Sequence, residues 1–193
     1  MNIKPIIEHF ANYSPLNALE IKELELRLFE RNIKRKQFIL QEGDVCKHYT
    51  FVVKGCFKMY KVDKKGNSHN LQFSIENGWI GDIGSFHTEK ASELYIEAME
   101  QSIILQIAKQ DLLYLYIHHP KFNLNFRVLI ENAFVSLQKR VLQNISLTAE
   151  ERYLDFLNNY PRLLNRISNV QIASYLGVTP EFLSKIRKDI VSR

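Results

Sequence analysis

The sequence contains few of the residues that indicate a secreted, metal-binding or membrane-spanning protein. Its 193 residues include only two cysteines, seven glycines and five prolines. Cys46 and Cys56 form neither a C-x-x-C pair nor a Cys/His metal spacing, so we expect buried free thiols. No apolar run approaches the ~20 residues that span a bilayer, and the N-terminus has no apolar signal core. These absences predict a soluble, cytoplasmic protein with no membrane partner.

Signatures of catalysis and of metal binding are also absent. The sequence has no glycine-rich phosphate loop, no nucleophile elbow and no paired carboxylates at useful spacing. His9, His48, His69 and His87 are scattered and lack the H-x-H spacing of a cupin metal site, and the pair His118-His119 ends a predicted helix. An iron-sulfur sensor would need an N-terminal cysteine cluster, and a haem sensor is disfavoured. We therefore predict no metal site, no certain cofactor and no enzymatic activity.

The charge of the chain is mildly basic. A formal net charge of +5 and a pI near 9.1 favour a polyanionic partner such as nucleic acid. The length allows one large domain and one small domain, each with its own core. This combination permits a sensor joined to an effector.

The apolar pattern has the period of β-strands over residues 30–108. Apolar positions alternate there, and turn signals such as Glu42-Gly43-Asp44 separate the runs at the spacing of a jelly roll or barrel. Ser14-Pro15 before this region has the form of a helix start. The basic run Arg31 to Lys36 is interpreted as a solvated strand edge that discourages sheet pairing. The fold class predicted is α+β, with an N-terminal antiparallel β-roll of jelly-roll or cupin type.

A long helix without glycine or proline is predicted over residues 121–145. One apolar stripe has the 4, 3, 4 spacing of a coiled-coil seam and predicts a dimer interface at Ile130, Phe134, Leu137 and Val141. A second stripe, formed by Phe126, Leu129 and Ala133, is expected to pack on the chain's own β domain. The alternative is a single core helix that is buried on both sides.

The C-terminal segment has the pattern of a helix-turn-helix. Thr148 and Glu151 form a capping-box pattern that restarts a helix after a hinge, and Pro161 stops it. A second capping box at Ser168-Asn169-Val170-Gln171 opens a short helix that ends at Gly177. Thr179 then offers an N-cap oxygen, and Pro180 has the preset φ of a first helical position.

The last helix is expected to present one face to DNA. Leu183, Ile186 and Ile190 share its inward face, which leaves the opposite face polar. We expect base contacts from Lys185 to guanine and from Glu181 to cytosine, each contributing ~1–3 kcal/mol of discrimination, and Ser184 is small enough to let the helix approach the groove. Phosphate contacts are expected from Thr179, Arg187 and Lys188. The predicted DNA-binding set is Thr179, Pro180, Glu181, Ser184, Lys185, Arg187 and Lys188. The alternative is a solvated face of a small helical domain.

Taken together, these segments resemble the Crp/Fnr family of bacterial transcription regulators. The similarity is carried by Gln41-Glu42-Gly43-Asp44, Val53-Lys54-Gly55, the segment 79–84, Arg152 and the segment 172–181. The resemblance implies a cyclic-nucleotide-binding-type β-roll at 1–120, a dimerisation helix and hinge at 121–147, and a helix-turn-helix domain at 148–193. It also implies a homodimer, double-stranded DNA as partner and RNA polymerase as a further partner. The family usually has Arg where this chain has Lys185, and lysine is a point charge rather than a bidentate fork.

The resemblance places an effector pocket but argues against cyclic AMP. The residues implied are Gly81, Asp82, Ile83, Ser92, Glu93, Leu137 and Gln138. Members that bind cyclic AMP have an Arg-Ser pair whose arginine clamps the phosphate, whereas the aligned pair here is Ser92-Glu93. Lys90 is a weak substitute. We expect a small-molecule effector of unknown identity, or none.

The family normally adds a two-stranded wing after the recognition helix, where this sequence stops at Arg193. We expect a minimal DNA-binding domain or weaker affinity. Two rival interpretations stay open at this point. One is a cupin-like ligand-binding module whose C-terminal helices serve only protein association, and the other is a small cupin-type enzyme.

Overall fold

The computed structural model describes residues 1–191, with side chains described through residue 190. The chain forms two compact units. The first combines Met1–Met59 with Phe73–Asn132, and the second combines Tyr60–Gln72 with the chain from Ala133 onward. The three-part division at residues 120 and 147 stays a prediction.

The strands form two four-stranded antiparallel sheets, which confirms the predicted fold class. The first sheet has the order β1 (Leu28–Ile33), β8 (Ser102–Ala108), β3 (His48–Lys54) and β6 (Trp79–Ile80). The second has the order β2 (Phe38–Leu40), β7 (Tyr95–Ala98), β4 (Phe57–Val62) and β5 (Ser68–Ser74). β1 is an edge strand, as the basic run predicted, and among the described residues it pairs with β8 alone.

Strand β3 is buried on both faces. The alternation of apolar residues predicted burial of one face only. Tyr49 and Phe51 point to one face, where both rings contact Trp79 at centroid distances of 5.3 and 5.2 Å. Thr50 and Val52 point to the opposite face because successive side chains of a strand alternate, and both are also buried. The polar Thr50 is therefore inside the roll, where it needs a hydrogen-bonding partner.

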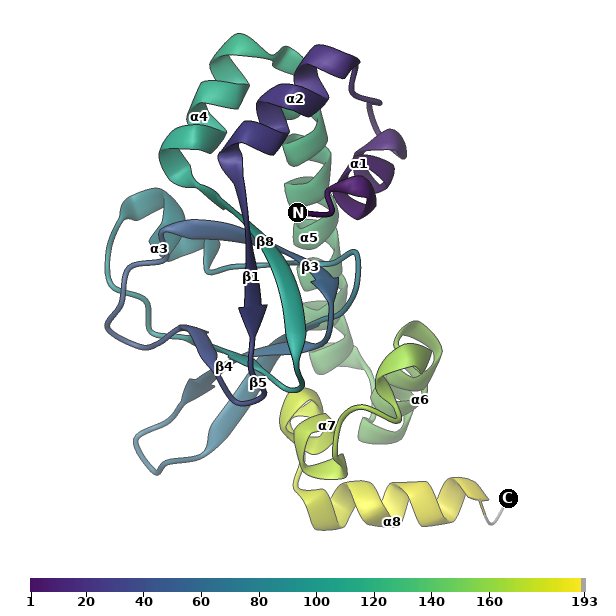
Figure 1. Ribbon diagram of the computed structural model, residues 1–193. Helices are drawn as coiled ribbons and strands as arrows, with labels where there is room; N and C mark the ends of the chain where they lie inside the picture. The colour runs from purple at the N-terminus through teal and green to yellow at the C-terminus, as the bar shows by residue number, and fades with distance from the viewer. Residues whose placement is uncertain (192–193) are drawn as a thin grey trace. The chain divides into compact units, whose positions relative to one another are not determined.

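Five helices surround the first sheet, and Figure 1 shows α1 (Lys4–Ala11), α2 (Ala18–Arg27) and α4 (Lys109–His118) gathered at one end of it. The others are α3 (Ile83–Thr88) and the first half of α5 (Pro120–Ser146). Sequence analysis predicted neither α1 nor α3. The predicted helix start at Ser14-Pro15 is wrong, because α2 begins after Asn17.

A capping box explains where α2 begins. The Asn17 side chain accepts a hydrogen bond from the Glu20 amide at 2.9 Å, and the Glu20 carboxylate accepts one from the Asn17 amide at 2.6 Å. Ser14 serves a different contact. Its backbone amide and carbonyl both bond the side chain of Asn125 at 3.0 Å. Asn125 is fully buried, so this pair ties the N-terminal segment to α5.

Aromatic side chains hold the first half of α5 against the sheet. The Phe126 ring lies 5.2 Å from Trp79, 5.5 Å from Phe10 and 6.0 Å from Tyr49. Phe126 and Leu129 are buried, as the second stripe predicted, whereas Ala133 is exposed. This half of the helix is part of the core of the first unit.

The second unit contains the end of α5 followed by α6 (Ala149–Asn159), a 3₁₀ turn at Pro161–Leu163, α7 (Asn169–Leu176) and α8 (Pro180–Val191). The predicted cap of α6 is confirmed. The Thr148 hydroxyl accepts from the Glu151 amide at 3.3 Å, and the Glu151 carboxylate accepts from the Thr148 amide at 2.8 Å. Within the described part of the chain, no helix has both the length and the apolar character needed to cross a bilayer.

Candidate nucleic-acid interface and effector pocket

The turn between α7 and α8 has the predicted chemistry. Gly177 ends α7 in the left-handed region at φ 69°, which glycine adopts at little cost. The Val178 amide then donates to Ala173 O at 3.0 Å and closes the corner. The Thr179 hydroxyl accepts from the Phe182 amide at 3.2 Å and caps α8, whose first residue is Pro180.

Helix α8 has one buried face and one exposed face. Leu183 and Ile186 are buried and Ile190 is half-buried, so the three residues predicted to face inward share the apolar face. The predicted base-reading side chains are all exposed, namely Glu181, Ser184 and Lys185. The structure therefore brings these three residues to one accessible helix surface.

Besides Thr179, two further predicted DNA-binding side chains make contacts within the unit. Arg187 Nη1 donates to Asn169 Oδ1, which ties its guanidinium to the start of α7. Ser184 Oγ donates to Pro180 O at 2.9 Å. Lys188, the other predicted phosphate contact, is exposed. Arg187 therefore has to share its donors between Asn169 and any phosphate.

Two arginines of the second unit bind backbone carbonyls near helix ends. Arg152 donates to Leu147 O at 3.0 Å and to Leu176 O at 3.3 Å, so it links the ends of α5 and α7. A cation is favourable at both ends because each carries negative helix-dipole charge. Arg140 stacks on the Tyr175 ring, 4.0 Å from its centroid, and donates to Tyr175 O at 2.8 Å. These contacts fix α7, the helix that precedes the predicted reading helix.

Residues 68–70 contact α7 within the same unit. Ser174 Oγ accepts from the Asn70 amide at 3.0 Å and donates to Ser68 O at 2.5 Å. Asn70 Nδ2 donates to Gln171 O at 3.0 Å. Sequence reasoning missed these contacts because the partners lie more than a hundred positions apart.

The second half of α5 presents an apolar stripe to solvent. Three of the four predicted interface residues are exposed, and the fourth, Ile130, is half-buried. The exposed fractions are 64% for Phe134, 58% for Leu137 and 49% for Val141. Ile145, four residues after Val141, is 79% exposed and was missed. A large uncovered apolar surface marks an interaction site.

The residues of the predicted effector pocket are only partly brought together. Asp82 Oδ2 accepts from Ser92 Oγ at 2.6 Å, and Asp82 Oδ1 accepts from the Ser85 amide at 3.1 Å as the cap of α3. Ser92 Oγ also accepts from the Leu94 amide at 3.0 Å. The polar atoms of Asp82 and Ser92 thus bond each other, and neither side chain supplies the positive charge that a cyclic phosphate would need.

The other predicted pocket residues have different surroundings. Gly81 and Ile83 are half-buried beside Asp82, and Glu93 is exposed. Leu137 and Gln138 are exposed on α5 in the second unit. Among the described residues, no group of three or more His, Cys, Asp or Glu side chains is arranged to hold a metal ion.

Comparison with known proteins identifies the β domain. Residues 30–119 match the family model described as "Cyclic nucleotide-binding domain". The regulatory protein HlyX of Actinobacillus pleuropneumoniae is 24% identical over 184 residues, which cover 89% of this chain and 75% of HlyX.

Solved structures share the fold over most of the chain. The c-di-GMP responsive global regulator CLP of Xanthomonas campestris matches with a TM-score of 0.75 at 14% identity, over 91% of this chain and 92% of CLP. FixK2 of Bradyrhizobium japonicum matches with a TM-score of 0.75 at 18% identity, over 86% and 85% of the two chains. A protein of Eubacterium rectale assigned to the crp/fnr family of transcriptional regulators matches with a TM-score of 0.71 at 18% identity, over 92% and 85%.

The comparisons and the fold agree with the sequence motifs. HlyX, CLP and the Eubacterium rectale protein are each named as regulators, which favours the regulator interpretation over the cupin-type enzyme. Residues 30–119 therefore match a cyclic nucleotide-binding domain, and over most of its length the chain is similar to regulatory proteins, among them one assigned to the crp/fnr family.

Proposed function

We propose that this protein is a sequence-specific DNA-binding regulator that acts as a homodimer on a palindromic site. The observation that supports it most is helix α8, which buries Leu183 and Ile186 and exposes Glu181, Ser184 and Lys185. An exposed helix face of this size with short and cationic side chains fits the major groove.

The exposed apolar stripe on the second half of α5 supports dimerisation. Pairing of two such helices would bury Phe134, Leu137 and Val141 of each copy, which are otherwise in water. The two copies of α8 would then read half-sites about 34 Å apart, one turn of DNA. Contact with RNA polymerase stays a prediction.

The proposed regulator is controlled by an effector other than cyclic AMP. The support is the Asp82–Ser92 hydrogen bond together with Glu93, because neither supplies the cation that a cyclic phosphate requires. Calorimetry with cyclic AMP is expected to give no binding. Micromolar affinity would overturn this part of the proposal.

Selection of bound sequences from a random duplex library tests DNA recognition directly. Wild-type protein is expected to enrich an inverted repeat, and Lys185→Ala is expected to relax the preference at one position of each half-site, by about 1–3 kcal/mol. Lys188→Ala is the matched control. It removes a phosphate contact, so it should weaken binding to all sequences and lower the salt slope by about one.

The salt dependence separates this function from the rival ligand-binding module. Binding of DNA by several cations must weaken steeply as ionic strength rises, because counterions are released. Failure of the wild type to enrich any sequence at either of two salt concentrations would favour the rival, in which the C-terminal helices associate with protein.

A further inference from the structure

A pocket of about 300 Å³ lies on the first unit beside the Asp82–Ser92 pair, since Gly81 precedes Asp82 and Asp44 O accepts from the Ser92 amide at 2.8 Å. Its polar lining comes from β1, β3, the segment before β3, and β8, and includes Arg31, Lys47, His48 and Gln106. Gly81 is the only residue that it shares with the predicted effector pocket. The pocket is therefore a separate candidate site.

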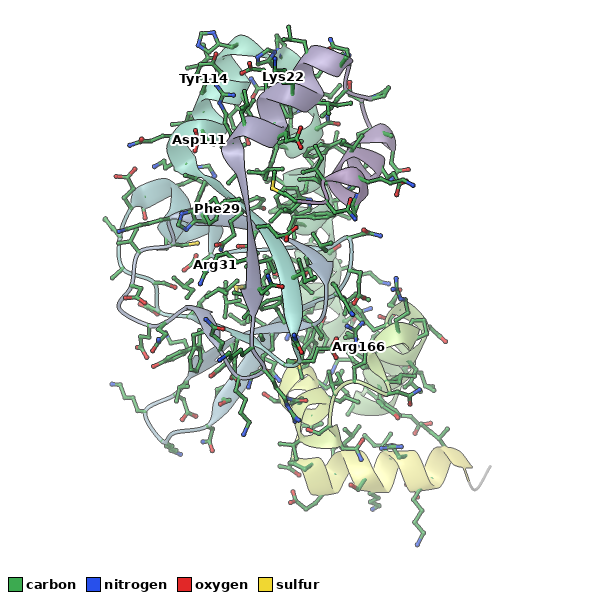
Figure 2. The ribbon with its side chains drawn as sticks, viewed as in Figure 1. Lys22, Phe29, Arg31, Asp111, Tyr114 and Arg166 are labelled. Atoms are coloured by element: carbon green, nitrogen blue, oxygen red, sulfur yellow. The ribbon has the colours of Figure 1, made fainter. Side chains whose placement is uncertain are left out.

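Arg31 is held in this pocket by a chain of buried polar groups. Its Nη1 donates to Gln106 Oε1 at 3.0 Å, and Gln106 Nε2 donates to Thr50 Oγ1 at 2.9 Å. Gln106 and Thr50 are each only 2% exposed. β1 is an edge strand, and Figure 2 labels Arg31 on it. The Arg31 side chain is nevertheless half-buried, so the prediction that it belongs to a solvated edge is wrong.

The hydrogen-bonding capacity of Arg31 is only partly used. A guanidinium carries five N–H donors, and one donates to Gln106. Among the described residues, Gln106 is the one hydrogen-bonding partner of this side chain. The buried Gln106 therefore orients the half-buried Arg31, and the remaining N–H groups of the guanidinium can donate to a ligand.

The charges of the pocket favour an anion. Arg31 and Lys47 supply two positive charges against the single carboxylate of Asp44, a net of +1. Burial, Arg31 and Lys47 together lower the pKa of His48, so its ring is neutral near pH 7. Phe29, at a centroid distance of 5.0 Å, covers one edge of this imidazole.

We propose that this pocket binds a small organic anion through a carboxylate or phosphate group placed on Arg31. Guanidinium and these groups form paired, charge-assisted hydrogen bonds. Ile39, Val45 and Ile96 provide an apolar wall for the remainder of the ligand. The volume is at the lower end of the range of small-molecule sites, which fits a small metabolite. The assignment of this anion as the effector rests on the proposed function, whereas binding itself does not.

An NMR titration of the full-length protein without DNA tests the site. Citrate and inorganic phosphate are added separately to ¹⁵N-labelled protein up to millimolar concentration. We expect saturable shifts at Arg31, in the segment 44–48 and at Gln106. A response to citrate only identifies a carboxylate site, and a response to phosphate only identifies a phosphate site.

Variants then assign the binding to the guanidinium. Arg31→Met keeps the aliphatic stem and should weaken binding at least about tenfold, because it removes the charge-assisted pair. Arg35→Met is the matched control, since Arg35 is exposed in the same basic run, and it should bind as the wild type does. Lys47 is exposed, so Lys47→Gln should leave the hydrogen bond between Arg31 and Gln106 intact. This variant should weaken anion binding by a smaller factor than Arg31→Met does.

Three results would overturn the proposal. They are the absence of saturable shifts with either anion, shifts confined to other surfaces, and unchanged affinity in both Arg31→Met and Lys47→Gln. Because no DNA is present, none of them bears on whether the protein binds DNA.

Discussion

The two halves of α5 have similar apolar periodicity and opposite surroundings. In the first half Phe122, Phe126 and Leu129 are covered by aromatic and aliphatic side chains of the same chain. In the second half Phe134, Leu137 and Val141 are about half exposed or more. The comparison teaches that an apolar stripe shows which residues avoid water, but not what covers them.

The comparison predicts different energetic roles for residues of the same type. A buried side chain stabilises the folded chain itself, whereas an exposed one can stabilise only an assembly. The same substitution in the two halves should therefore change different measurements.

The largest effect is expected for Phe126→Ala. It deletes a ring that contacts Trp79 and Phe10, and removal of a buried phenylalanine costs about 3–5 kcal/mol of unfolding free energy. Urea denaturation measures the loss, and emission of the single tryptophan should shift to the red as Trp79 loses packing.

Phe134→Ala is the matched control in the exposed half of the helix. Its ring is 64% exposed, so native Trp79 emission should stay unchanged. An equal red shift in both variants would contradict the comparison, since it would mean that Phe134 also supports the core of the first unit.

Leu137→Asp is expected to break the dimer and not the fold. A charge placed in a paired apolar seam loses its hydration without a partner, which costs about 3–5 kcal/mol and weakens association by more than about a hundredfold. Sedimentation equilibrium measures the dimer dissociation constant. Gln138→Asp adds the same charge at the next exposed position, about 100° round the helix, and should have a much smaller effect.

A smaller effect is expected for Thr179→Ala in the second unit. It removes the acceptor for the Phe182 amide at the start of α8, and loss of an N-cap costs about 0.5–2 kcal/mol. Hydrogen exchange should become faster in the first turn of α8. Thr148→Ala removes the cap of α6, so exchange should become faster there and stay unchanged in α8.

The smallest effect concerns His48 in the first unit. Because burial and the cations Arg31 and Lys47 lower its pKa, the folded protein takes up this proton at lower pH than the unfolded chain. The stability that a neutral His48 contributes is therefore present above about pH 6.5 and is lost as the pH falls toward the folded-state pKa.

Replacement of a neighbouring cation tests that cause. Arg31→Met should raise the pKa of His48 by less than about one unit, as measured from its ring proton shifts by NMR. The groups that face this imidazole are Arg31, Lys47 and the Phe29 ring, with Asp44 in the same pocket. A fall in the pKa would contradict the electrostatic account.

Much of the second unit could be predicted because its signals are local. Capping at Thr148 and Thr179 joins residues three positions apart, and Gly177 supplies a left-handed φ by itself. The exposed and buried faces of α8 follow from helical spacing alone. Each of these features depends on about four consecutive residues or on the repeat of the helical period.

The first unit was predicted less completely because its polar contacts join distant segments. Arg31 is interpreted correctly only when Gln106, 75 positions away, is known to lie beside it. Asn125 likewise holds Ser14 across 111 positions, which explains why Ser14 does not cap a helix. The two residues of such a contact lie in different segments, and no sequence pattern links one segment to the other.

The sequence by itself determined the antiparallel β domain, the long helix, the helix-turn-helix and the family resemblance, because apolar periodicity, caps and turn residues act over short distances. Only the tertiary structure decided that Asp82 bonds Ser92 and that Arg31 enters a pocket. It also decided which half of α5 is covered. The physical reason is that burial and charge pairing depend on which strands become neighbours, and neighbours in a sheet are chosen by packing of the whole chain.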